Sequence, residues 1–138
     1  MNGFVTSARF DRVINLPLAL PQTELRGGKA MTLVELALAR HQRLELRSLS
    51  LTLLAVLTPG AVPVYLNTAL GLCSVGFYRS DMLTAPLALV TYTDQAATVN
   101  PFSPCVVETP GNYLVIASNN TSNIDLAVCA TGSLKLLY

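Results

Sequence analysis

The sequence predicts an all-β protein: an antiparallel β-sandwich of about eight short strands, preceded by an extended N-terminal arm. Two observations predict this class. From Arg43 onward, apolar and polar residues alternate with a period of two, as in strands that bury one face. Turn-forming residues interrupt the alternation about every 8 to 14 residues, a spacing typical of sandwiches and jelly rolls. We therefore expect a jelly roll.

The arm is expected over residues 1–30. Within it, VINLPLALPQ (13–22) has an apolar side chain at nearly every other position, but its two prolines cannot donate to the middle of a sheet. Gly27-Gly28 supplies a joint at its end. An apolar segment of this kind should lie along its own domain or along a neighbouring subunit. We expect removal of residues 1–27 to leave a folded domain with weaker assembly.

The sandwich domain is expected over residues 31–138 and begins with an ambiguous stretch. In MTLVELALARHQ (31–42), Leu33 and Leu36 fit a helical stripe, whereas alternation from Thr32 through Leu38 fits a strand. We favour the strand.

The next segment, RLELRSLSLTLLAV (43–56), alternates clearly but changes phase once. Leu44 and Leu46 share one face, and after an extra residue at Ser48 the alternation resumes at Leu49. Such a slip predicts a β-bulge or a bend at a sheet corner.

The remaining strands and turns follow from the same alternation and from clusters of Gly, Pro, Asn and Ser. Strands are expected at 62–66, 72–78, 86–93, 105–108, 112–117, 124–130 and 134–137, and turns at 58–60, 67–71, 79–81, 100–104, 110–111, 118–123 and 131–132.

Composition indicates that more apolar surface is present than one small core absorbs. Charged residues make up 12% and hydrophobic residues 51%, with a mean hydropathy of +0.48; an average soluble protein is about 25% charged. A membrane or a subunit interface would take up the surplus. The net charge of +1 argues against a nucleic-acid partner. Residues 1–47 carry seven basic and four acidic side chains (+3) and the rest two and four (−2), an asymmetry that orients the subunit on a partner or has no role.

A membrane span and a signal peptide are both disfavoured. The interval between Arg47 and Arg79 has no charge, but Pro59, Gly60 and Pro63 would break a helix there. Charged residues also interrupt the N-terminus before any apolar run. We therefore expect no membrane partner, and synthesis in a host cytoplasm.

No catalytic or metal-binding constellation is apparent, so we expect no enzymatic activity, metal or cofactor. His41 is the only histidine, and Cys73, Cys105 and Cys129 lack CxxC spacing, which favours buried thiols. The carboxylates are dispersed singly. Asn119-Asn120-Thr121 fits a glycosylation pattern, but we interpret it as part of a turn.

The C-terminal third, PGNYLVIASNNTSNIDLAVCATGSLKL, resembles the closing strands of the jelly-roll decoration, or cement, proteins of tailed-bacteriophage capsids. An N-terminal arm before a β domain is also similar to that family's layout. The resemblance implies a virion structural protein without a cofactor. It would be a homotrimer, seated between major capsid proteins on the capsid surface, that stabilises the shell.

Twelve residues are candidate contacts with other subunits or with the capsid. Those of the arm are Phe4, Arg9, Phe10, Arg12, Val13, Ile14, Leu16, Leu18 and Leu20, and those of the first regular strand are Arg43, Glu45 and Arg47. The last three share one strand face, which is either solvated or a charge ladder facing a partner.

The alternative function is a phage tail or baseplate component, or a β-sandwich module that binds a carbohydrate or a receptor. The absence of tryptophan and the scattered tyrosines weigh against an aromatic sugar platform.

Overall fold

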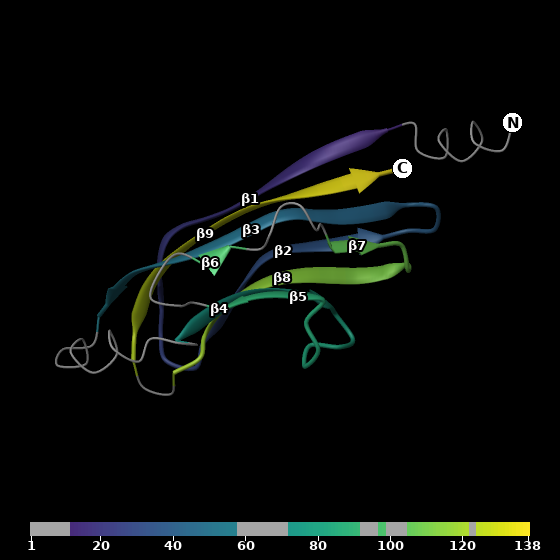
Figure 1. Cartoon of the computed structure of the whole chain (residues 1–138). Helices are drawn as coiled ribbons and strands as arrows, with labels where there is room; N and C mark the ends of the chain where they lie inside the picture. The colour runs from purple at the N-terminus through teal and green to yellow at the C-terminus, as the bar shows by residue number, and fades with distance from the viewer. Residues whose placement is uncertain (1–11, 58–71, 92–96, 99–104, 122–123) are drawn as a thin grey trace, which may run out of the picture.

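The computed structural model describes residues 12–57, 72–91, 97–98, 105–121 and 124–138. These residues form two antiparallel sheets packed face to face (Figure 1). Sheet A has the order β1–β9–β3–β6, with β7 also paired to β3, and sheet B has the order β2–β8–β4–β5. The strands of sheet A are β1 (Val13–Leu25), β9 (Leu126–Leu137), β3 (Arg43–Val56), β6 (Ala97–Thr98) and β7 (Cys105–Val107), and those of sheet B are β2 (Ala30–Leu38), β8 (Gly111–Asn119), β4 (Cys73–Arg79) and β5 (Ala88–Thr91).

This strand order is that of a jelly roll. The first strand pairs with the last in sheet A, and the second pairs with the last but one in sheet B. The chain thus passes back and forth between the sheets, as two interlocked Greek keys require. β6 and β7 both pair with β3 in the antiparallel sense, so they are two pieces of an eighth strand. The predicted fold class is confirmed.

The core lies between the two sheets and is built from the inward phase of each strand. Sheet A supplies mainly leucines, and sheet B supplies valines and two aromatic rings. The rings of Phe77 and Tyr113 stack with centroids 5.7 Å apart, and the Tyr113 hydroxyl donates to the Thr109 carbonyl at 2.6 Å. The largest fully buried side chains are Tyr113, Phe77, Leu44, Leu46, Leu49, Leu51, Leu126, Leu134, Val75, Val115, Val128 and Cys73.

The expected division between an arm and a domain is wrong at residues 13–25. These residues are extended, but they form β1, an edge strand of sheet A paired with β9 over its whole length. Leu18 and Leu20 are each 6% exposed and belong to the core. The prolines are compatible with this position because an edge strand pairs on one side only. Removing residues 1–27 would therefore remove part of the sandwich.

The predicted phase slip in β3 is confirmed as a β-bulge, but Ser48 is not the extra residue, because it is paired with β9. Leu46 is opposite Leu134 and Ser48 is opposite Ser133, so Arg47 is the extra residue. The structure also explains an error in the sequence interpretation. Thr131-Gly132 is not a turn, since β9 runs straight through it past this bulge.

The ambiguous stretch after residue 30 is the strand β2, as favoured. It ends in a tight connection to β3 in which His41 has a positive φ of 64°. Strands at 72–78, 86–93, 105–108, 112–117 and 124–130 correspond to β4, β5, β7, β8 and part of β9, with shifted ends. The predicted strand at 62–66 and the turns at 58–60, 67–71 and 100–104 lie outside the described residues. In the described part of the chain no helix is long and apolar enough to cross a bilayer.

Candidate assembly interface

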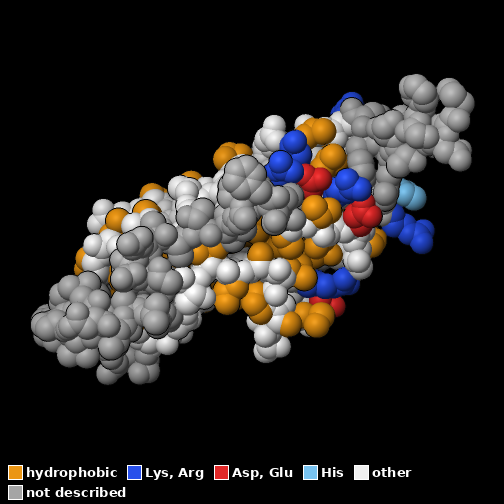
Figure 2. All heavy atoms as spheres, viewed as in Figure 1, with side chains coloured by type: hydrophobic (Ala, Val, Ile, Leu, Met, Phe, Trp, Pro, Cys, Tyr) orange, Lys and Arg blue, Asp and Glu red, His pale blue; other side chains and the backbone are white. Residues whose placement is uncertain are grey.

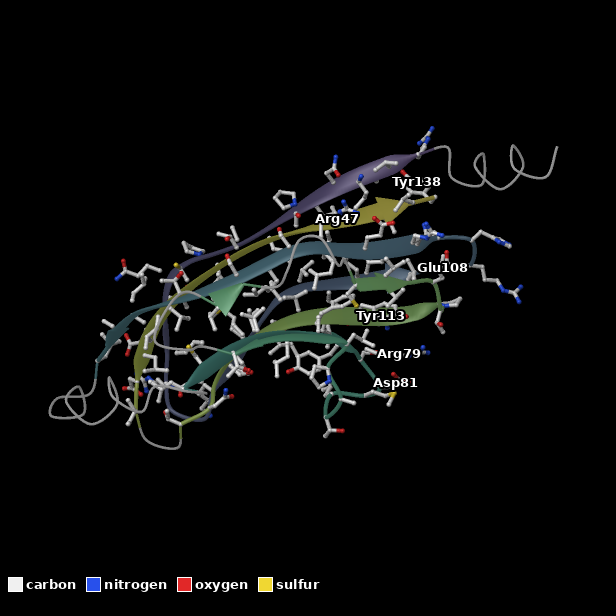
Figure 3. The ribbon with its side chains drawn as sticks, in the orientation of Figure 1. Arg47, Arg79, Asp81, Glu108, Tyr113 and Tyr138 are labelled. Carbon is white, nitrogen blue, oxygen red and sulfur yellow. The ribbon has the colours of Figure 1, made fainter. Side chains whose placement is uncertain are left out.

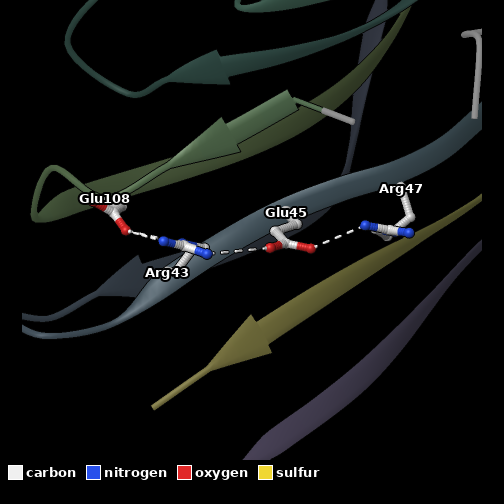
Figure 4. Close-up of polar contacts among 4 residues, drawn as sticks. All are labelled: Arg43, Glu45, Arg47 and Glu108. Atoms are coloured by element: carbon white, nitrogen blue, oxygen red, sulfur yellow. Dashed lines mark hydrogen bonds and ion pairs between the residues drawn. The ribbon is translucent and has the colours of Figure 1, made fainter. Parts of the chain in front are cut away.

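A row of alternating charges crosses the outer face of sheet A. Arg43 contacts Glu108 at 2.8 Å and Glu45 at 3.9 Å, and Arg47 contacts the other oxygen of Glu45 at 3.1 Å (Figure 4). The Glu45 side chain is only 12% exposed and lies between the two guanidinium groups (Figure 4). We call these four residues the charge ladder. The ladder contains two cations and two anions, so its net charge is zero. A partner would meet alternating positive and negative side chains.

The sequence placed three members of this ladder on one face, and the structure confirms that placement. Glu108 was missed, because it follows β7 and reaches Arg43 only through the pairing of β7 with β3. Exposed ion pairs contribute about 0–1 kcal/mol each to stability. The ladder is therefore not what holds the sandwich together, and its role as a partner contact stays a prediction.

Small polar side chains also pair across this face, beside Val106, which lies opposite Glu45 and is 46% exposed. The Ser48 and Ser133 hydroxyls lie 3.0 Å apart, and those of Ser50 and Thr131 lie 2.7 Å apart. Each hydroxyl pair satisfies hydrogen-bonding groups across β3 and β9. The outer face of sheet A is thus mixed, with polar pairs across β3 and β9 and exposed apolar side chains at Val13 and Val106.

The outer face of sheet B is different, because apolar side chains occupy its outward phase. In β4, Val75 and Phe77 point into the core, so Gly76 and Tyr78 point outward. The Tyr78 side chain lies over Gly76: a β-carbon built on that glycine would be 2.6–2.7 Å from two ring carbons and the hydroxyl oxygen of Tyr78.

The register places four further apolar residues around this ring. Leu89 and Ile116 flank Gly76 on β5 and β8, and Leu114 flanks Tyr78. Leu87 precedes β5 and follows the same outward phase; its amide donates to the Phe77 carbonyl. We call Tyr78, Leu87, Leu89, Leu114 and Ile116 the sheet B patch.

The patch continues into the connection between β4 and β5. Leu87 and Leu89 are 44% and 48% exposed, and Met82 and Leu83 in the connection are 54% and 53% exposed. Figure 2 shows apolar side chains gathered over β5 and this connection, along the lower border of the view. Figure 3 shows Arg79 and Asp81 beside them, joined by an ion pair of 3.0 Å that borders the apolar surface.

Sequence reasoning missed the sheet B patch, although a signal for it was present. Strands covered on both faces have near-continuous apolar runs instead of alternation. Residues 113–117 read YLVIA, and residues 85–90 read APLALV. The first run lies in β8 and the second leads into β5, and their outward-facing members contribute to the patch.

The predicted contacts of the arm are divided by the structure. Leu18 and Leu20 are in the core and unavailable to a partner, and Leu16 is partly buried. Val13 and Ile14 are exposed at the start of β1, next to exposed Arg12. Phe4, Arg9 and Phe10 lie outside the described residues.

The remaining chemically notable side chains have structural roles. Cys73 is buried, which raises its pKa from 9.0 to about 11, and partial burial raises the pKa of Cys105. The expectation of three buried thiols is wrong for Cys105 and Cys129, which are only partly buried. The Asn119 amide is buried and donates to the carbonyls of Leu25 and Ile124 at 2.8 and 2.7 Å. Asn119 thus ties the end of β1 to the approach of β9. No group of three or more potential metal ligands occurs in the ranges described.

Comparison with known proteins finds likeness only at the level of three-dimensional structure. No protein-family model and no curated protein matches the chain. The structure of infectious bursal disease virus, Gx strain, contains a chain with 13% identity and a TM-score of 0.47; the match covers 93% of this chain and 33% of that chain. An archaeal virus described by its triple jelly-roll fold and turret assembly gives 11% identity, a TM-score of 0.44, and coverage of 93% and 29%. The crystal structure of FlhE gives 10% identity, a TM-score of 0.40, and coverage of 91% and 96%.

This chain spans about a third of the length of the two viral chains. With TM-scores below 0.5 and identities of 10–13%, these likenesses carry no argument about what the chain does. The jelly-roll assignment rests on the strand order.

Proposed function

We propose that the chain is a non-enzymatic structural subunit of a virion, a decoration or cement protein that assembles as a homotrimer. In this proposal it binds between major capsid proteins on the shell surface and stabilises the shell. The observation that carries the assembly role is the apolar sheet B patch, in which Leu87 and Leu89 are about half exposed.

The energetic argument concerns side chains that a monomer leaves half in water. Burying a Leu or Met side chain fully stabilises by about 1.5–3 kcal/mol, so a half-exposed one offers about 1 kcal/mol more on contact. Met82, Leu83, Leu87 and Leu89 are each about half exposed. Together they offer roughly 4 kcal/mol of gross association energy, part of which ordering and lost rigid-body freedom offset.

The two outer faces then have different tasks. The sheet B patch supplies the apolar contact between subunits. The charge ladder and the exposed start of β1 supply oriented polar and apolar contacts to the shell, because charge patterns fix register and partner choice more than they add affinity.

Native mass tests the assembly role. Light scattering after size exclusion should give a trimer for the wild type and a monomer for the double variant Leu87→Lys/Leu89→Lys, with an unchanged circular dichroism spectrum. The matched control is Ser50→Lys/Thr131→Lys, which places the same charges on the outer face of sheet A and should remain trimeric.

A wild-type protein that remains monomeric at about 100 μM would contradict self-assembly, since subunit interfaces of standard size hold well below that concentration. That outcome would favour a tail, baseplate or receptor-binding module that uses the patch for a ligand.

A further inference from the structure

In the described sandwich, the β1 edge of sheet A is a long edge that no charged side chain interrupts between Val13 and Thr23. β1 has 13 residues. The other edges are guarded in familiar ways. β5 has 4 residues, β6 and β7 have 2 and 3, and β2 carries Glu35 and a register shift. Long, uncharged, apolar edge strands are sites where a second chain adds a strand.

The hydrogen-bonding phase of β1 can be read from its first residues. Arg12 and Tyr138 exchange both backbone bonds, at 2.8 and 3.0 Å. In an antiparallel pair such positions alternate with positions whose N–H and C=O groups point away from the partner strand. The pairing is regular from Val13 to Leu20. The backbone N–H and C=O groups of residues 14, 16, 18 and 20 therefore point toward β9. Those of residues 13, 15, 17 and 19 point toward the open edge.

Pro17 falls in the open-edge phase. Its missing N–H costs nothing in the pairing with β9 and removes one of the four donors that this stretch would offer to another chain. Pro21 follows at the point where the register shifts, since Leu20 is opposite Ala130 and Thr23 is opposite Val128. A second proline and a bulge thus interrupt the same edge four residues further on, and both side chains are exposed.

We propose that Pro17 and Pro21 are edge guards that prevent a β-strand of a second copy of this chain from pairing with the open edge of β1. They interrupt the edge where no charge does so, and they direct self-association away from the sheet edge. The inference does not depend on the proposed virion role, because it follows from the backbone phase of β1 alone.

Hydrogen exchange of the native protein tests the phase. The amides of Asn15 and Ala19 should exchange at least about tenfold faster than those of Leu16 and Leu18, because only the latter two are bonded to β9. Equal protection of the two sets would overturn the assignment of Pro17 to the open edge.

Restoring the donors tests the guard itself. Pro17→Val/Pro21→Thr should fold, since both side chains point to solvent, and should self-associate at least about tenfold more tightly. That factor corresponds to about 1.4 kcal/mol, about the net contribution of one backbone hydrogen bond. The matched control is Ala19→Val, which adds a β-branched side chain at an open-edge position that already has its donor. The measurement is sedimentation velocity across a concentration series.

The same substitutions should be made in the Leu87→Lys/Leu89→Lys background, where association through the sheet B patch is removed. New association in that background supports the edge guard, whatever the fate of the patch. If the double proline variant associates no more than Ala19→Val, the proposal is wrong. Pro17→Val alone serves as the test if the double variant loses its circular dichroism signal.

Discussion

Gly132→Ala should destabilise the fold although it adds only one methyl group. Gly132 lies in the middle of β9, opposite Leu49 and next to the β3 bulge. A β-carbon at this position would be 2.5 Å from the Ser48 carbonyl oxygen and 3.2–3.3 Å from two Leu49 atoms. The Ser48 oxygen belongs to the backbone, so β3 itself must move to make room.

The magnitude follows from a comparison with Gly76→Ala. There a β-carbon would be 2.6–2.7 Å from the Tyr78 ring, a clash of similar depth against the end of a side chain that can turn into solvent. Overpacking against fixed atoms costs about 1–3 kcal/mol, whereas Gly→Ala at an unstrained position stabilises by about 0.4–1 kcal/mol through the unfolded chain. We expect Gly132→Ala to lower the free energy of unfolding by about 1–3 kcal/mol, and Gly76→Ala to change it by less than about 1 kcal/mol.

Urea unfolding followed by circular dichroism measures both variants. For a domain of this size, each kcal/mol corresponds to about 3–5 °C in Tm, so thermal unfolding gives a second reading. Two variants within about 0.5 kcal/mol of each other would refute the reasoning that the bulge requires a glycine opposite it.

Three further predictions concern single side chains. Asn119→Ala should lower the free energy of unfolding in urea by about 2–4 kcal/mol, because it removes the amide donor of the buried Leu25 carbonyl and leaves the Ile124 carbonyl with the Thr121 hydroxyl alone. His41→Gly should raise the free energy of unfolding by about 0.5–1 kcal/mol, and with it the Tm, because the left-handed φ of 64° is strained for a residue with a side chain. The control Arg40→Gly, in the same turn, should lower the Tm. Cys73, with its pKa raised by burial from 9.0 to about 11, should resist alkylation at pH 8 until urea unfolds the chain. The stability gained by burying the neutral Cys73 thiol is fully present below pH 9. It should be lost between pH 9 and 11, where the thiol ionises in the unfolded chain but not in the folded one. Rapid native alkylation would contradict that burial.

Much of the architecture was predictable because each strand carries its own alternation. The slip after Leu46 located the β3 bulge correctly, since buried leucines on both sides of it require the same face. The error at Thr131-Gly132 has a definite cause. Glycine favours turns locally, and only the approach of the Ser48 carbonyl from another strand shows why it stands inside β9.

The candidate surfaces show the same division. The face shared by Arg43, Glu45 and Arg47 was predictable from their spacing, whereas Glu108 was not, because β7 brings it from 65 residues away. The apolar runs in sheet B were visible but ambiguous. When every residue of a strand is apolar, the sequence does not show which alternate side chains point into the core and which point outward.

The sequence by itself determined the class of fold, the places of most of the described strands and the surplus of apolar side chains, because these depend on period-two patterns and composition. Only the tertiary structure decided that residues 13–25 are an edge strand and no detachable arm. It also decided that Leu18 and Leu20 are core, that part of the surplus emerges on the outer face of sheet B, and that Pro17 points its missing donor at an open edge. Each of these depends on which strand lies beside which. That is a matter of long-range pairing and register, which no local pattern in the chain records.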